Sequence, residues 1–135
     1  MQKQHILLPL FVIMAAIGIL HHFALANFWY WTIWWIDVVM HTLGGVVLGL
    51  AALWFLLSVH RVQSWPPRRV FVVVLGVVFA VGVAWEFFEF FAKLFVQGHF
   101  FPDTVLDIFA DVAGGLVAFA YYLGLHPKDT LTCIS

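Results

Sequence analysis

The stretch that decides the fold is Val70–Glu89, which reads VFVVVLGVVFAVGVAWEFFE. It carries no charge from Val70 to Trp85 and then ends in two acidic residues, Glu86 and Glu89. A helix that crosses a bilayer needs about 20 mostly apolar residues. The stretch therefore predicts a transmembrane helix with carboxylates near one end.

The composition of the whole chain also indicates a membrane protein. Of its 135 residues, 64% are hydrophobic and 10% are charged, and the mean hydropathy is +1.04. Soluble domains carry about 25% charged residues, so soluble enzymes and disordered proteins are disfavoured. The net charge of −1 offers no electrostatic footprint for nucleic acid. The single Cys133 excludes an intramolecular disulfide and a cysteine-based metal site.

We expect an all-α fold, a bundle of four transmembrane helices. The apolar stretches are Ile6–Ala26, Thr32–Val59, Val70–Val96 and Asp103–Leu125. Their short connections predict antiparallel neighbours within one transmembrane domain, residues 1–125, followed by a polar cytoplasmic tail, residues 126–135. The first stretch resembles a signal peptide, and we expect it to be retained as the first span.

Basic residues predict the orientation, because Lys and Arg concentrate on the cytoplasmic side. If both termini and the middle loop are cytoplasmic, five basic residues share that side and only Lys93 lies on the other. The five are Lys3, Arg61, Arg68, Arg69 and Lys128. We therefore expect both termini in the cytoplasm.

Six of the seven acidic residues fall inside or at the mouths of the predicted spans. They are Asp37, Glu86, Glu89, Asp103, Asp107 and Asp111. An ionisable group in hydrocarbon costs about 2.5–3.5 kcal/mol on insertion scales, so these groups must face the bundle interior, pair, be protonated or hold a cation. Asp103 follows Pro102 at a helix start, and we expect it to be an N-cap rather than a ligand.

The other acids and one histidine recur at helical spacing. The pairs are Asp37 with His41, Glu86 with Glu89, and Asp107 with Asp111. Each pair is three or four residues apart and shares a helix face. Because the helices alternate in direction, all three pairs lie about one to two turns below the outer end of their span. They predict one polar layer in the outer half of the membrane.

A short internal repeat supports this layer. Asp37-x3-His41-x2-Gly44-Gly45 matches Asp107-x3-Asp111-x2-Gly114-Gly115 at an offset of 70 residues. Glycine pairs allow transmembrane helices to approach closely. Two hairpins related by a pseudo-two-fold axis would bring the two motifs face to face.

Carboxylates combined with imidazole suit a divalent ion such as Zn, Mn, Fe or Mg. Such side chains on facing helices form the metal sites of four-helix bundles, although the usual Glu-x-x-His pair is absent here. We therefore predict a metal site, with protonated or paired acids that only pack the helices as the alternative. Its ligands would be Asp37, His41, Glu86, Glu89, Asp107 and Asp111.

The order of these motifs resembles the VanZ-like small membrane proteins and their YjdF-like relatives. The likeness covers about the last three spans and departs at three positions, where this chain has Val38 for a usual Lys, Glu89 for Gln and Asp111 for Asn. The resemblance implies a bacterial inner-membrane protein linked to envelope lipids, and it supplies no reaction.

Three functions stay open at this stage. The first is a metal-dependent enzyme that acts on a lipid-linked phosphate or ester near the outer leaflet. The second is binding or translocation of a cation or proton without catalysis. The third is an accessory subunit of a larger membrane complex. A homo-oligomer or such a complex is the expected protein partner. Membrane lipids are the expected partners in each case.

Overall fold

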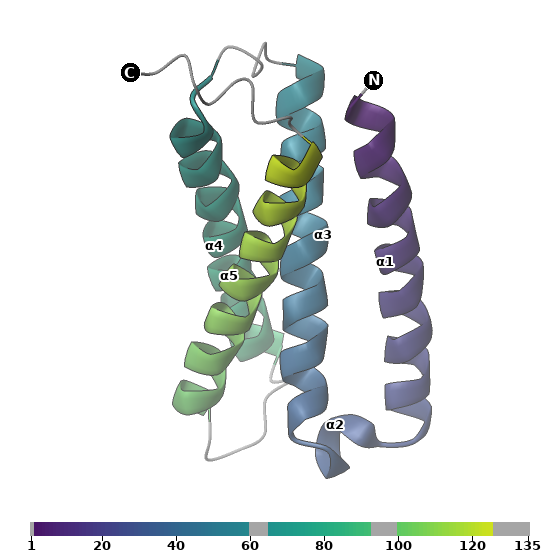
Figure 1. The fold of residues 1–135 in the computed structure, drawn as a ribbon. Helices are drawn as coiled ribbons and strands as arrows, with labels where there is room; N and C mark the ends of the chain where they lie inside the picture. The colour runs from purple at the N-terminus through teal and green to yellow at the C-terminus, as the bar shows by residue number, and fades with distance from the viewer. Residues whose placement is uncertain (1, 60–64, 93–99, 126–135) are drawn as a thin grey trace.

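The computed structural model describes residues 2–59, 65–92 and 100–125. Every regular element in these ranges is a helix (Figure 1). The helices are α1 (Gln2–Ala26), α2 (Trp29–Thr32), α3 (Trp35–Val59), α4 (Pro67–Ala92) and α5 (Phe100–Leu125). All except α2 are long and apolar enough to cross a membrane, with candidate spans at Gln4–Ala26, Trp35–Ser58, Pro67–Ala92 and Pro102–Leu125. The expected all-α fold with four spans is confirmed.

The connection between the first two spans contains its own short helix. Phe28 precedes α2 in a left-handed backbone conformation, with φ 59°, and Ile33 follows it in an extended one. A left-handed conformation is uncommon for a bulky residue and marks a sharp turn. The chain therefore turns twice before α3, which begins at Trp35 and not at Thr32.

The other helix limits follow from local chemistry. Helix α4 begins at Pro67, because proline lacks an N–H and the first helical position needs none. Helix α5 begins at Phe100, so Asp103 lies within its first turn and is not its N-cap. Residues 93–96 of the expected third span and the tail 126–135 lie outside the described residues.

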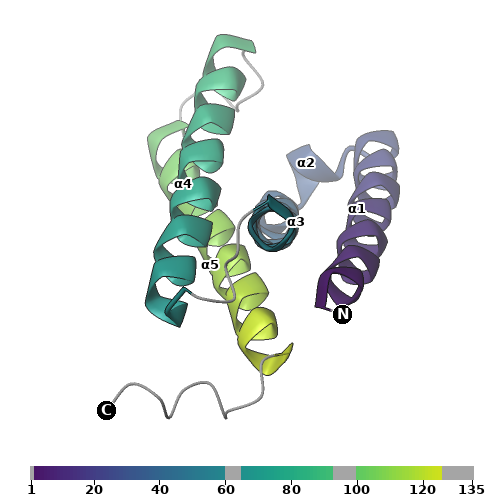
Figure 2. The ribbon, with the colours of Figure 1, turned by 90° about the horizontal axis from the view of Figure 1, so that it is seen from above.

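Helix α3 stands at the centre of the molecule. Helix α1 lies on one side of it, and α4 and α5 cross each other on the other side (Figure 2). Leu50 and Leu53 of α3 are buried in one core cluster with Val70 and Val74 of α4. Helix α1 is the least enclosed, with only 11% of its apolar window buried. Its exposed apolar surface suits a helix that faces lipid on most sides.

Helices α3 and α5 run in the same direction and touch at their glycines. A Cβ on Gly45 would overlap the backbone oxygen of Asp111, and one on Gly114 would overlap the backbone of Thr42 and Val46. The two halves of the internal repeat thus meet face to face, as predicted. The pairing of the hairpins is not symmetrical, because α4 packs on both α3 and α5 whereas α1 packs mainly on α3.

Candidate functional site

The candidate site is built around His41, which lies one turn into α3 and is 8% exposed. Its Nδ1 is 3.3 Å from Oδ1 of Asp111 on α5, within hydrogen-bonding distance. Its Nε2 is 4.0 Å from Oδ1 of Asp37 on its own helix, which is too long for a hydrogen bond. The imidazole is therefore held mainly by the neighbouring helix.

Two sets of potential ligand atoms share this histidine. Asp37, His41 and Asp107 form one set, and His41, Glu86 and Glu89 form the other, with the ligand atoms of each set within 4.8 Å of one another. Together with Asp111, these side chains come from α3, α4 and α5. The structure thus brings all six residues of the predicted site into one cluster, called the acidic cluster below. Asp103 belongs to neither set.

Two carboxylate oxygens of the acidic cluster are buried and unpaired. Oε1 of Glu86 and Oδ1 of Asp107 have no hydrogen-bond partner within the described part of the chain. The two residues are only 5% and 2% exposed. A buried polar atom without a partner costs about 1–3 kcal/mol, and more when it is charged. These oxygens are therefore the acceptors that a ligand would satisfy.

The helix dipole affects an acidic residue differently at the two ends of a helix. Asp37 lies in the first turn of α3, where the positive end of the helix dipole stabilises a carboxylate. Glu89 lies within the last described turn of α4, where the dipole disfavours negative charge. Glu89 therefore needs a positive partner more than Asp37 does.

Basic side chains do not supply that partner within the described residues. Arg68 and Arg69 lie at the opposite end of α4, where Arg69 stacks on the ring of Trp65 at 4.0 Å. Lys93, whose spacing places it on the face of Glu86 and Glu89, lies outside the described residues. His41 is the one side chain of the acidic cluster that can carry positive charge. Like charges this close cannot all ionise without a counter-charge.

The structure adds neighbours that the sequence analysis missed. Trp85 donates a hydrogen bond from Nε1 to Oε1 of Glu89 at 2.8 Å, a contact that its i,i+4 spacing could have indicated. A Cβ on Gly82 would crowd Oδ2 of Asp111, so this glycine lets α4 approach the cluster. No local signal identifies Gly82, because its role depends on how α4 crosses α5.

Tyr30 lies on α2, outside the candidate spans. Its hydroxyl is 2.7 Å from Nδ1 of His21 at the end of α1. Burial, followed by the negative charges of Asp37 and Glu89, raises the pKa of the Tyr30 phenol. The hydrogen bond between Tyr30 and His21 joins the end of α1 to α2.

Four apolar spans, three of which supply the side chains of the acidic cluster, define a small polytopic integral membrane protein. The chain belongs to the family described as "Predicted membrane protein (DUF2238)", whose family model matches residues 2–128. Neither the curated proteins nor the solved structures contain a match to this chain.

Proposed function

We propose that the acidic cluster binds one divalent cation in the membrane half that contains α2, and that this half is the outer one. The single observation that carries the proposal is the pair of buried, unpaired oxygens on Glu86 and Asp107. Both oxygens would coordinate a bound cation, and the cation would offset the surrounding negative charge. If the acids only packed the helices together, the two oxygens would stay without a partner and the negative charges without a counter-charge.

The spacing of the ligand atoms supports a single ion. Oxygen and nitrogen ligands lie about 2.0–2.2 Å from Zn²⁺, so ligands on opposite sides of an ion are roughly 4–4.5 Å apart. The potential ligand atoms lie within 4.8 Å in each set. Oxygen ligands with one imidazole fit Zn, Mn, Fe or Mg.

Binding of a cation fits the spans better than its translocation. From Val46 to Ser58 and from Val70 to Trp85 the spans contain no Asp, Glu, His, Lys or Arg, and the same holds from Val112 to Leu125. A translocated ion would have to cross this apolar half without a ligand. The Gly45 and Gly114 contacts close the space between α3 and α5 just below the cluster.

The cation would serve to bind or act on envelope lipids in a bacterial inner membrane. The depth of the cluster supports this role, because it lies within about 15 Å of the helix ends at 1.5 Å per residue. The spacing of Asp37, His41, Glu86 and Asp107 supports a relationship to the VanZ-like and YjdF-like proteins. The extra carboxylates at Glu89 and Asp111 favour a cation at this site over neutral polar packing.

Elemental analysis of the purified, detergent-solubilised protein tests the cation site. We expect close to one divalent ion per chain, and its loss in Glu86→Gln and Asp107→Asn. Asp103→Asn is the matched control, because it also removes a carboxylate from a span but lies outside both sets of ligand atoms. A folded wild-type protein that binds no divalent ion after incubation with Zn, Mn, Fe or Mg would refute the proposal.

A further inference from the structure

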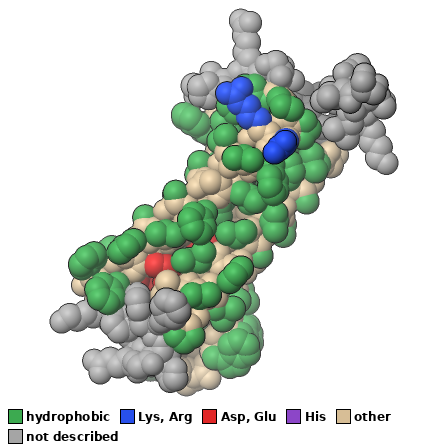
Figure 3. All heavy atoms as spheres, turned by 90° about the vertical axis from the view of Figure 1, so that its left-hand side faces the viewer, with side chains coloured by type: hydrophobic (Ala, Val, Ile, Leu, Met, Phe, Trp, Pro, Cys, Tyr) green, Lys and Arg blue, Asp and Glu red, His purple; other side chains and the backbone are tan. Residues whose placement is uncertain are grey.

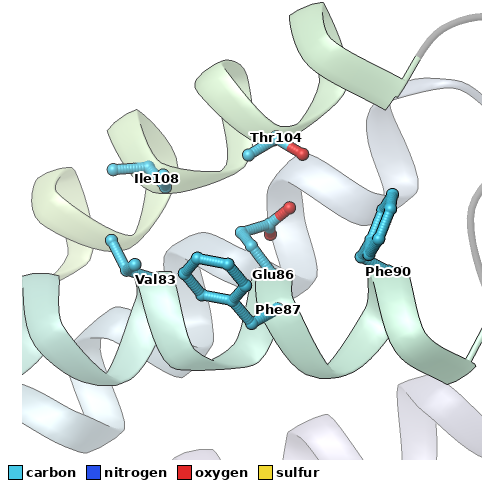
Figure 4. Close-up of a pocket in the computed structure, with 6 residues that line it drawn as sticks. All are labelled: Val83, Glu86, Phe87, Phe90, Thr104 and Ile108. Atoms are coloured by element: carbon cyan, nitrogen blue, oxygen red, sulfur yellow. The ribbon is translucent and has the colours of Figure 1, made fainter.

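The acidic cluster has an outward side between α4 and α5. A pocket of about 390 Å³ opens there, lined by Val83, Glu86, Phe87, Phe90, Thr104 and Ile108. Glu86 projects from α4 into the space between the two helices, with Thr104 and Ile108 facing it from α5 (Figure 4). The exposed wall of the pocket is apolar. Glu86 therefore belongs both to the acidic cluster and to the pocket.

The pocket opens on an apolar surface formed by α4 and α5. The face formed by α4 and α5 is covered by hydrophobic side chains, with acidic side chain visible only inside a hollow (Figure 3). Phe87, Phe91 and Phe109 are 61%, 77% and 69% exposed on these two helices. Exposed phenylalanines on membrane-spanning helices face hydrocarbon. The pocket therefore opens sideways into the bilayer.

The size of the pocket limits which kind of ligand it can bind. Sites for small molecules have volumes of about 300–1,000 Å³. A further helix, about 10 Å across, would not fit between α4 and α5. A lipid chain has the right shape, and Val83 and Ile108 would hold its deeper part. The polar end of the lipid would then lie toward Phe90 and Thr104, nearer the helix ends.

The negative charge of the acidic cluster favours a lipid with a positively charged head group. The acidic cluster contains five carboxylates, so up to five negative charges face one divalent cation and one imidazole. Glu86 lines the pocket, and its carboxylate has a second oxygen besides the Oε1 assigned above to the cation. An ammonium group supplies both a donor and positive charge, and its hydrogen bond to a carboxylate is among the stronger kinds. An anionic head group would be repelled.

We propose that this pocket holds the chain of a membrane lipid with an ammonium head group, and that the ammonium group points toward Glu86. The inference rests on the proposed function, because Glu86 serves the cation on one side and the lipid on the other. Phosphatidylethanolamine is the appropriate probe.

Photocrosslinking tests the pocket. The full-length protein is placed in nanodiscs of phosphatidylglycerol that contain a tracer with a diazirine in its acyl chain, either phosphatidylethanolamine or phosphatidylglycerol. We expect the ethanolamine tracer to label peptides that contain Val83 or Ile108 roughly tenfold more strongly, as befits a hydrogen bond to a charged group. Chelation with EDTA should strengthen this preference, because removal of the cation leaves the carboxylates more negative.

Val83→Trp should fill the pocket and abolish the labelling. Val77→Trp is the matched control, because Val77 is an exposed valine of the same helix that does not line the pocket. Both variants should retain the wild-type Tm in nanodiscs, which shows that they fold. Labelling that is spread evenly over all spans, is unaffected by Val83→Trp, or is lost with EDTA would overturn the lipid assignment. Absence of metal in the wild-type protein would instead refute the proposed function and leave the pocket labelling interpretable.

Discussion

Gly45 and Asp111 pack backbone against backbone where α3 crosses α5. A Cβ on Gly45 would overlap the carbonyl oxygen of Asp111, whose carboxylate lies 3.3 Å from His41. The same crossing that brings the two helices together therefore also fixes the distance across the acidic cluster. Close helix packing and the geometry of the candidate site cannot change independently.

Gly45→Ala is therefore expected to weaken both the fold and the site. The added methyl group forces α3 and α5 apart, which costs about 1–3 kcal/mol for an overpacked contact. Thermal unfolding in detergent should show a lower Tm, and elemental analysis should show reduced metal content. Gly76→Ala is the control, because a Cβ there meets nothing within 4 Å. It should be neutral or stabilising by up to about 1 kcal/mol, since alanine favours helix. Equal Tm values for Gly45→Ala and the wild type would contradict the crossing.

Much of the architecture was predictable from the sequence, because a bilayer constrains helices strongly. Span length follows from hydrocarbon thickness, and short connections force alternating directions. These two constraints were enough to place Asp37, Glu86 and Asp107 at one depth. The i,i+3 and i,i+4 spacings then placed each pair on one helix face.

The contacts between helices were less predictable, because they depend on helix rotation and crossing. The sequence suggested an Asp37–His41 pair along one helix, but the shorter contact of His41 is with Asp111 on another. Gly82 gives no signal in sequence, although it admits the Asp111 carboxylate next to α4. The turn at Phe28 was also not predictable from the sequence, because phenylalanine rarely adopts the left-handed backbone conformation.

His41 belongs to both sets of ligand atoms, so its loss should be more harmful than loss of Glu89. We expect His41→Ala to weaken divalent-ion binding more than about 100-fold, beyond the 10–100-fold typical of residues that only support a ligand. Glu89→Ala should have a smaller effect, because an oxygen of Glu89 already accepts a hydrogen bond from Trp85. Titration with Mn²⁺ followed by electron paramagnetic resonance measures both. The prediction fails if the two variants bind Mn²⁺ with equal affinity.

Binding of the cation should also weaken as the pH falls. Carboxylates and imidazole bind metal in their deprotonated forms, so protons compete with the ion. Between about pH 7 and pH 4, where histidines and carboxylates ordinarily titrate, the affinity should fall steadily. The same Mn²⁺ titration, repeated across this range, measures the effect. Affinity that is independent of pH would indicate that the ion binds elsewhere.

Tyr30 should report occupancy of the acidic cluster. Its pKa lies above the ordinary tyrosine value of about 10, because of burial and then the charges of Asp37 and Glu89. A cation that offsets these carboxylates removes part of the cause, so it should lower the pKa of Tyr30. Ultraviolet absorbance of tyrosinate, taken as the difference between wild type and Tyr30→Phe, measures this pKa with and without the divalent ion. An unchanged or raised pKa on saturation would place the ion away from Asp37 and Glu89.

Helix α1 is held by few contacts, and its two faces should differ sharply in their tolerance of substitution. Ile6 is 0% exposed within the core cluster, whereas Leu8, two residues on, is 71% exposed. Loss of side-chain volume at Ile6 leaves a cavity. Because a lipid-exposed reference state is itself apolar, the cost is mainly lost packing, about 1–2 kcal/mol rather than the larger values of soluble cores. Ile6→Ala should therefore lower the Tm in lipid nanodiscs, and Leu8→Ala should leave it nearly unchanged. The reverse order would mean that α1 presents its other face to α3.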